Sequence, residues 1–114
     1  MNAPVLISGT SELQARAGAA ARLLKLMANE QRLQLLCRLA DGEAPVGELA
    51  SHVGLTASAT SQHLSRMRAE NLVATRRDAQ TIHYRLADPA AERVLETLCD
   101  IYGVESGRPG AGGR

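Results

Sequence analysis

The sequence predicts a mainly α-helical domain with one β-hairpin close to its C-terminal end. Over residues 11–71 the apolar side chains recur at the three- and four-residue spacing of amphipathic helices. The pattern then changes to two short runs with strand composition, "LVATRR" and "TIHYRL", joined by "DAQ". A chain of 114 residues is long enough for one domain with a modest core. We therefore expect the order helix, helix, helix, helix, hairpin, helix.

The composition is that of an ordinary soluble protein with a small aliphatic core. Apolar residues make up 45% of the chain and charged residues 22%, which excludes the disordered class. Two tyrosines are the only aromatic residues. The core must therefore consist of Leu, Val, Ala and Met, and contacts to nucleic acid cannot depend on aromatic base stacking.

The first predicted helix covers residues 11–27, "SELQARAGAAARLLKLM", with Ser11 as its N-cap. Its inner stripe consists of five apolar residues at helical spacing: Leu13, Ala17, Ala20, Leu24 and Met27.

The second predicted helix is "EQRLQLLCRLA", which Asn29 can cap and Gly42 ends. Its inner stripe includes one of the two cysteines: Leu33, Leu36, Cys37 and Ala40.

The third and fourth helices are separated by a tight "GLT" turn. In "PVGELASHVG", Pro45 lies near the start of a short helix and Gly54 follows its end. Thr56 then caps "ASATSQHLSRMRAEN", in which Leu64 and Met67 point inward. A short helix, a tight turn and a second helix with polar residues form a helix-turn-helix, and a hairpin directly after it makes a winged helix.

The dipeptide Asp88-Pro89 predicts the start of the last helix, "AAERVLETLCDIY". Asp88 supplies a cap, and proline fits the first turn. The apolar face contains four residues, with Cys99 beside them: Val94, Leu95, Leu98 and Tyr102.

The net charge of +1 says little about partners, but its distribution does. Between Thr56 and Leu86 five arginines accompany two carboxylates, a local excess of three positive charges that is typical of a phosphate-binding surface. The start of the second helix of the motif would enter the major groove of double-stranded DNA, and the hairpin would contact phosphates or the minor groove. The predicted DNA-binding residues are Ser58, Thr60, Ser61, Gln62, His63, Arg66, Arg68, Arg76, Arg77, Gln80 and His83.

Several functional classes lack support. No Cys-x-x-Cys, Gly-rich phosphate loop or Ser/His or Cys/His set with a carboxylate is present, so we expect neither an enzyme nor a cofactor. The start of the chain does not resemble a secretory signal and no stretch is long enough to span a membrane, which predicts a cytoplasmic protein with reduced thiols. We expect a flexible tail over residues 1–10, the winged-helix domain over 11–103 and a disordered, Gly-rich tail over 104–114.

The chain resembles the arsenic-repressor (ArsR/SmtB) family of bacterial winged-helix repressors. The resemblance spans roughly residues 20–103 and is carried by "ANEQRLQLL", "VGELASHVGLTASATSQHLSRMRAENLV" and "RRDAQTIHYRL". It implies a mainly α winged helix-turn-helix (ααααββα) that forms a homodimer through its first and last helices. It also implies binding to a palindromic operator, from which an effector releases the protein.

The family is best known for metal sensing, but this chain lacks the ligands of both familiar sites. Pro45 and Gly47 occupy the positions of the two cysteines of the metal-thiolate motif. Of the interfacial zinc site only Asp88 remains, and the other three positions hold Ala90, Ile101 and Val104. Zinc and softer metals need thiolate or imidazole ligands. Three histidines share no ligand spacing, so no metal site is predicted: His52, His63 and His83.

The segment "RLQLLCRLADGEAPVGELA" resembles the sulfide- and redox-sensing branch, the BigR/SqrR/HlyU-like repressors. The resemblance implies that a cysteine in the second helix and one in the last helix are joined by oxidants or persulfides, which releases the operator. Cys37 matches the first position, whereas the second falls at Gly103 and Cys99 lies one turn earlier. One turn is about 6 Å along the axis, and a disulfide tolerates Cα separations of about 4.4–6.8 Å. A longer sulfur chain relaxes that limit.

Three other interpretations remain open. The winged helix could be a protein-interaction module that does not bind DNA. Free cysteine is often a small buried apolar residue, so Cys37 and Cys99 could be core filler. The DNA-binding protein could instead respond to a metal ion or a small molecule at the dimer interface. The leading hypothesis is a dimeric repressor whose effector is an oxidant or a reactive sulfur species acting on both cysteines.

Overall fold

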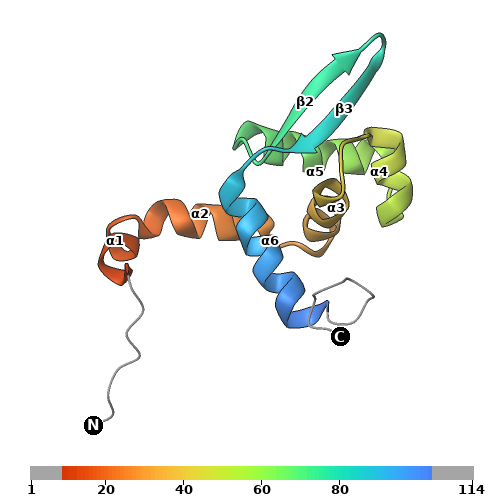
Figure 1. Ribbon diagram of the computed structural model, residues 1–114. Helices are drawn as coiled ribbons and strands as arrows, with labels where there is room; N and C mark the ends of the chain where they lie inside the picture. The colour runs from red at the N-terminus through yellow and green to blue at the C-terminus, as the bar shows by residue number, and fades with distance from the viewer. Residues whose placement is uncertain (1–8, 104–114) are drawn as a thin grey trace.

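The computed structural model describes residues 9–103, and it contains six helices and three strands within that range (Figure 1). The elements are α1 (Thr10–Ala15), α2 (Ala17–Met27), α3 (Glu30–Ala40), β1 (Ala44–Pro45), α4 (Val46–Val53), α5 (Ala57–Ala69), β2 (Val73–Asp78), β3 (Thr81–Leu86) and α6 (Pro89–Tyr102). The fold is therefore mainly α with a β-hairpin, as predicted. The expectations for residues 1–8 and 104–114 lie outside the described residues.

The single helix predicted for residues 11–27 is wrong, because the chain breaks at Arg16 (φ −117°, ψ 25°) into α1 and α2. Ser11 is not the N-cap. It lies inside α1, whose N-cap is Gly9 in the left-handed region at φ 90°. Every residue of α1 is exposed, so no packing holds the two segments in one axis. In Figure 1, α1 projects away from the other helices.

The predicted inner stripe of the first segment holds only at its end. Met27 is buried, whereas Leu13 and Leu24 are 55% and 54% exposed in the single chain. The core begins at Leu26 and Met27, where α2 meets α3.

In α3 the predicted cap is confirmed, since the Asn29 side chain accepts a hydrogen bond from the Arg32 backbone N–H at 3.0 Å. The predicted inner face is rotated. Leu36 is buried as expected, but Cys37 and Ala40 are exposed and Leu33 is half-buried. Leucines occur at four positions around this helix, so periodicity alone could not fix which of them face inward. The buried face consists of Arg32, Leu35, Leu36 and Leu39.

The helix-turn-helix forms as predicted from α4 and α5. Gly54 ends α4 at φ 71°, a left-handed conformation that favours glycine. Thr56 caps α5 by accepting a hydrogen bond from the Ala59 N–H at 3.0 Å. Leu64 and Met67 are fully buried and fix the orientation of α5 against the core.

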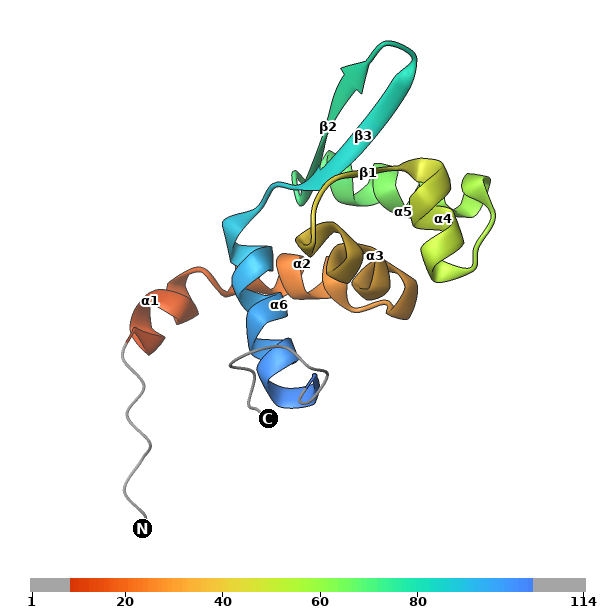
Figure 2. The same ribbon diagram turned by 45° about the vertical axis from the view of Figure 1, so that its right-hand side comes forward.

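The hairpin belongs to a three-stranded antiparallel sheet with the order β1-β3-β2. The register of β2 and β3 runs from Val73↔Leu86 to Asp78↔Thr81, which leaves a two-residue turn with Ala79 at φ 58°. The third strand, β1, was not predicted, because two residues carry no periodicity. It pairs with the base of β3. Figure 2 shows the hairpin extending beyond the helices.

The last helix, α6, begins as predicted, with the Asp88 side chain accepting a hydrogen bond from the Ala90 N–H at 2.8 Å. Its apolar face is partly as predicted. Leu95 is buried, but Tyr102 is 78% exposed. Val94, Leu98 and Cys99 are half-buried. None of the helices within residues 9–103 is long and apolar enough to cross a membrane.

Candidate nucleic-acid interface and dithiol pocket

The recognition helix α5 presents a polar stripe at four-residue spacing. Ser58, Gln62 and Arg66 are all exposed, and positions i, i+4 and i+8 lie on one face of a helix. Ser61 and His63 flank the stripe and are half-buried, and Arg68 is exposed on another side. The stripe combines two hydrogen-bonding side chains with one cation, which are the types of group that proteins use toward base edges and phosphates.

Thr60 was predicted to contact DNA, and its position contradicts this. Its side chain is fully buried, and its hydroxyl donates to the Thr56 carbonyl at 2.8 Å. The residue therefore fixes the first turn of α5 and does not present its hydroxyl to a ligand.

His63 is half-buried and lies within the electrostatic influence of two arginines. Burial is the largest cause that lowers the pKa of His63, and the charges of Arg32 and Arg66 add to it. The shift favours the neutral ring, in which one nitrogen can accept a hydrogen bond.

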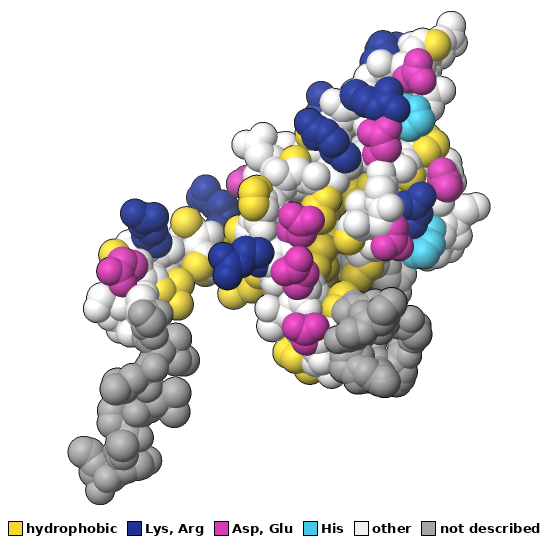
Figure 3. Space-filling model, in the orientation of Figure 1, with side chains coloured by type: hydrophobic (Ala, Val, Ile, Leu, Met, Phe, Trp, Pro, Cys, Tyr) yellow, Lys and Arg dark blue, Asp and Glu magenta, His cyan; other side chains and the backbone are white. Residues whose placement is uncertain are grey.

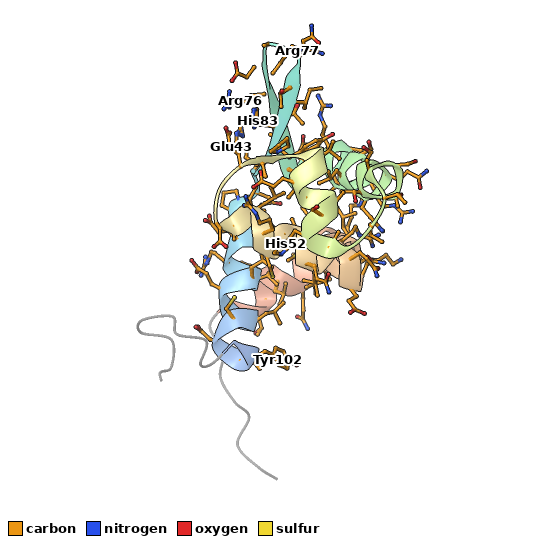
Figure 4. All side chains as sticks on the ribbon, turned by 90° about the vertical axis from the view of Figure 1, so that its right-hand side faces the viewer. Glu43, His52, Arg76, Arg77, His83 and Tyr102 are labelled. Atoms are coloured by element: carbon orange, nitrogen blue, oxygen red, sulfur yellow. The ribbon has the colours of Figure 1, made fainter. Side chains whose placement is uncertain are left out.

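The hairpin formed by β2 and β3, here called the wing, carries cationic side chains. In the space-filling view Lys and Arg side chains lie along the hairpin with Asp and Glu side chains among them, and further Asp and Glu side chains follow α6 (Figure 3). Arg77 lies near the tip of the hairpin, and Arg76 and His83 lie nearer its base (Figure 4). Arg76 and His83 are cross-strand partners. Arg76, Arg77 and Gln80 are exposed, and His83 is half-buried.

Sequence reasoning missed a partner of the wing, Glu43. Its carboxylate accepts hydrogen bonds from Nε of Arg76 at 2.8 and 3.0 Å and also pairs with Nη2. The hydrogen bond to Arg76 is the largest cause that lowers the pKa of Glu43, and it raises the pKa of Arg76. The partners lie 33 residues apart, so no local pattern could have linked them.

The two cysteines come from α3 and α6 and line the same two cavities. The first has a volume of about 700 Å³ and is mainly apolar, with His52 of α4 on its wall. Gly103, the position at which the resemblance places the second cysteine, lines the same cavity as Cys99, one turn earlier in α6. The second has a volume of about 530 Å³ and is acidic. Its lining carboxylates are Asp41, Glu92, Glu96 and Asp100.

The pKa of the Cys37 thiol is raised. Although the residue is exposed, desolvation by surrounding protein atoms is the largest cause, followed by the charges of Cys99 and Asp41. Arg38 cannot offset this, because it forms an ion pair with Glu48 at 3.3 Å and donates to the Gly42 carbonyl. Both cysteines are free thiols. The environment of Cys37 therefore favours the protonated thiol over the thiolate.

Among residues 9–103, no group of three or more His, Cys, Asp or Glu side chains is arranged to hold a metal ion. The second cysteine and the carboxylates beside it do not form such a group.

Comparison with known proteins identifies the family. Residues 29–75 match the model described as "Bacterial regulatory protein, arsR family". The chain is 46% identical over 91 residues to the transcriptional activator HlyU of Vibrio cholerae, an alignment that covers 80% of this chain and 84% of HlyU.

Two solved structures have the same fold. The transcriptional repressor BigR from Xylella fastidiosa superposes with a TM-score of 0.77 at 35% identity, covering 82% of this chain and 95% of BigR. The homodimeric winged helix-turn-helix DNA-binding domain of Mb0332 from Mycobacterium bovis superposes with a TM-score of 0.67 at 27% identity, covering 89% and 91%. These relatives are regulators, which agrees with the expectation that the chain is not an enzyme. The chain belongs to the arsR family of bacterial regulatory proteins and is a DNA-binding transcriptional regulator with a winged helix-turn-helix fold.

Proposed function

We propose that the protein is a dimeric repressor that binds double-stranded operator DNA in its reduced state and leaves it when Cys37 and Cys99 become covalently linked. The effector is an oxidant or a reactive sulfur species. The observation that carries this proposal is that both cysteines of the chain line the same cavities, although they come from α3 and α6.

The exposed stripe of α5 and the wing support the DNA-binding part. In this proposal Ser58 and Gln62 contact base edges, Arg66 contacts phosphate, and Arg77 extends along the adjacent backbone or minor groove. The proposed interface also includes six further residues of α5 and the wing: Ser61, His63, Arg68, Arg76, Gln80 and His83.

Exposed apolar side chains support a homodimer through the first and last helices. Leu13 and Leu24 on α1 and α2, and Ile101 and Tyr102 on α6, are each more than half exposed in the single chain. Burying such groups against a second copy is favourable. The similarity to the homodimeric Mb0332 domain supports the same assembly.

The sulfur chemistry balances without a cofactor. The thiolate of one cysteine attacks the outer sulfur of a persulfide RSSH, which yields a protein persulfide and RSH. The second cysteine attacks the inner sulfur of this persulfide and expels H₂S, so a disulfide forms. With two RSSH molecules the products are a trisulfide bridge, two RSH and one H₂S. Peroxide would accept the two electrons of the dithiol and be reduced to two molecules of water.

A covalent link between Cys37 and Cys99 would change how α3 and α6 are positioned relative to each other. The helix α3 contacts α4, α5 and α6, so a bond between α3 and α6 changes the constraint on the recognition helix. In a dimer joined through α6, such a change alters the spacing of the two recognition helices and misaligns them with the operator half-sites.

Operator release by persulfide tests the proposal. An operator selected from a random duplex library by reduced protein is titrated before and after treatment with a persulfide donor. Wild-type protein should lose affinity and regain it with dithiothreitol, whereas Cys37→Ser and Cys99→Ser should bind DNA when reduced and remain bound after treatment. Equal release of wild type and both variants would refute the switch.

The apolar cavity favours one alternative effector, a small apolar molecule. Its volume of about 700 Å³ is within the range of ligand pockets. In that case an apolar extract component would release the operator from the Cys37→Ser/Cys99→Ser variant as readily as from wild type.

A further inference from the structure

A basic pocket lies where α2, α3 and α5 meet, away from both cysteines. It has a volume of about 380 Å³, and four of its lining side chains are cationic: Arg22, Lys25, Arg32 and Arg66. Glu70 is the one carboxylate among the lining residues. In the described part of the chain, none of the four cations forms an ion pair with a carboxylate.

Arg32 is a buried cation in the wall of this pocket. The residue is only 7% exposed, and its Nε donates to the Leu26 carbonyl at 2.6 Å. Within residues 9–103 its Nη atoms make no hydrogen bond, although a guanidinium carries five N–H donors. Burial and the charge of Arg66 both lower its pKa. A buried guanidinium without an anionic partner is unfavourable, so an anion bound here would relieve desolvation and repulsion together.

The chemistry of the pocket selects phosphate. Guanidinium groups bind phosphate oxygens in a bidentate geometry, and the lysine adds a fourth cation to the three arginines. An apolar ligand would leave the buried cation without a partner, and a metal cation would be repelled.

We propose that this pocket binds a phosphate group, and that in the operator complex this is a backbone phosphate at the Arg66 end of the recognition stripe. The second part rests on the DNA interface proposed above. Arg66 belongs both to the exposed stripe of α5 and to the pocket, so the two surfaces are continuous. Arg22, Lys25 and Arg32 would then act as a clamp on DNA formed by α2 and α3, outside the helix-turn-helix.

The test uses the exposed cations of the pocket, because replacing Arg32 could prevent folding. Arg22→Gln/Lys25→Gln is compared with Arg16→Gln/Arg93→Gln, which makes the same change in net charge with two exposed arginines outside the pocket. Each variant is first shown by light scattering to have the same molar mass as the wild type.

Two measurements separate the possible sources of phosphate. The first is the dependence of operator affinity on salt concentration. In a plot of the logarithm of affinity against the logarithm of salt concentration, the slope of the pocket variant should be shallower by about one to two per subunit. The control variant should retain the wild-type slope. The second is a titration of DNA-free protein with inorganic phosphate, followed by the backbone amide resonances of Arg32 and Arg66. The wild type should show saturable chemical-shift changes, and the phosphate affinity derived from them should be at least tenfold lower in the pocket variant.

The outcomes distinguish this inference from the proposed function. A shallower slope assigns the pocket to the DNA backbone, and an unchanged slope with saturable phosphate shifts assigns it to free phosphate. Unchanged slope together with absent or non-saturating shifts would overturn the inference. If the protein binds no DNA at all, the proposed interface fails while the titration still decides whether the pocket takes phosphate.

Discussion

Glu43 holds the guanidinium of Arg76 from the connection between α3 and β1, so the wing is anchored to the body of the domain by an ion pair. Both side chains are partly exposed, at 32% and 51%. Exposed ion pairs contribute little to stability. The pair therefore serves mainly to position Arg76 and to reduce its availability for phosphate.

Replacing Glu43 should strengthen DNA binding. In Glu43→Gln the guanidinium of Arg76 loses its carboxylate partner, and operator affinity should rise by about three- to tenfold at low salt, with a small change in melting temperature. Fluorescence anisotropy with a labelled operator measures the affinity. Glu48→Gln, whose carboxylate pairs with Arg38 on another surface, is the matched control. Weaker binding of Glu43→Gln would show that the ion pair orients the wing productively.

The raised pKa of Cys37 predicts a distinctive pH profile for alkylation. At any pH below the folded-state pKa, less thiolate is present than in a free cysteine, so iodoacetamide modification should have its midpoint above about pH 8.5. Mass spectrometry of timed samples gives the rate at each pH.

Two variants check the cause of that shift. Cys99→Ser and Asp41→Asn each remove an electrostatic interaction that raises the pKa of Cys37, so each should move the midpoint down towards the ordinary value. Glu12→Gln on α1 removes a distant exposed carboxylate and should leave the midpoint unchanged. A wild-type midpoint below the ordinary value would contradict the geometry.

The opposite environments of Gln62 and Thr60 on one helix predict opposite phenotypes. Gln62→Ala should weaken operator binding by about 1–3 kcal/mol and leave the melting temperature nearly unchanged, because the side chain is exposed. Thr60→Val removes the hydrogen bond to the Thr56 carbonyl, so it should lower stability by about 1 kcal/mol. Thermal unfolding and anisotropy on the same samples separate the effects. A large loss of affinity in folded Thr60→Val would restore its role as a DNA contact.

Local signals predicted the elements that depend on local chemistry. Asn29, Thr56 and Asp88 each cap the helix that their position indicated, because a side-chain oxygen next to an apolar repeat is a sufficient signal. The change of period at residue 72 located the hairpin. These features together define the winged helix.

The features that local sequence patterns do not predict depend on contacts between distant segments of the chain. The break at Arg16 follows from the absence of packing around α1, which no local pattern reports. The inner face of α3 depends on which leucines meet α4 and α5. The pairing of Glu43 with Arg76 and the basic pocket around Arg32 are formed by residues that only the tertiary structure brings together.

A peptide map decides whether Cys37 and Cys99 react with each other. Reduced protein is treated with a persulfide donor and, separately, with peroxide, and its intact mass and proteolytic peptides are then measured. We expect a peptide pair joined through Cys37 and Cys99, with or without inserted sulfur, that dithiothreitol separates. Two free cysteines, or cysteines modified separately and never joined, in protein that binds its operator would refute the dithiol switch.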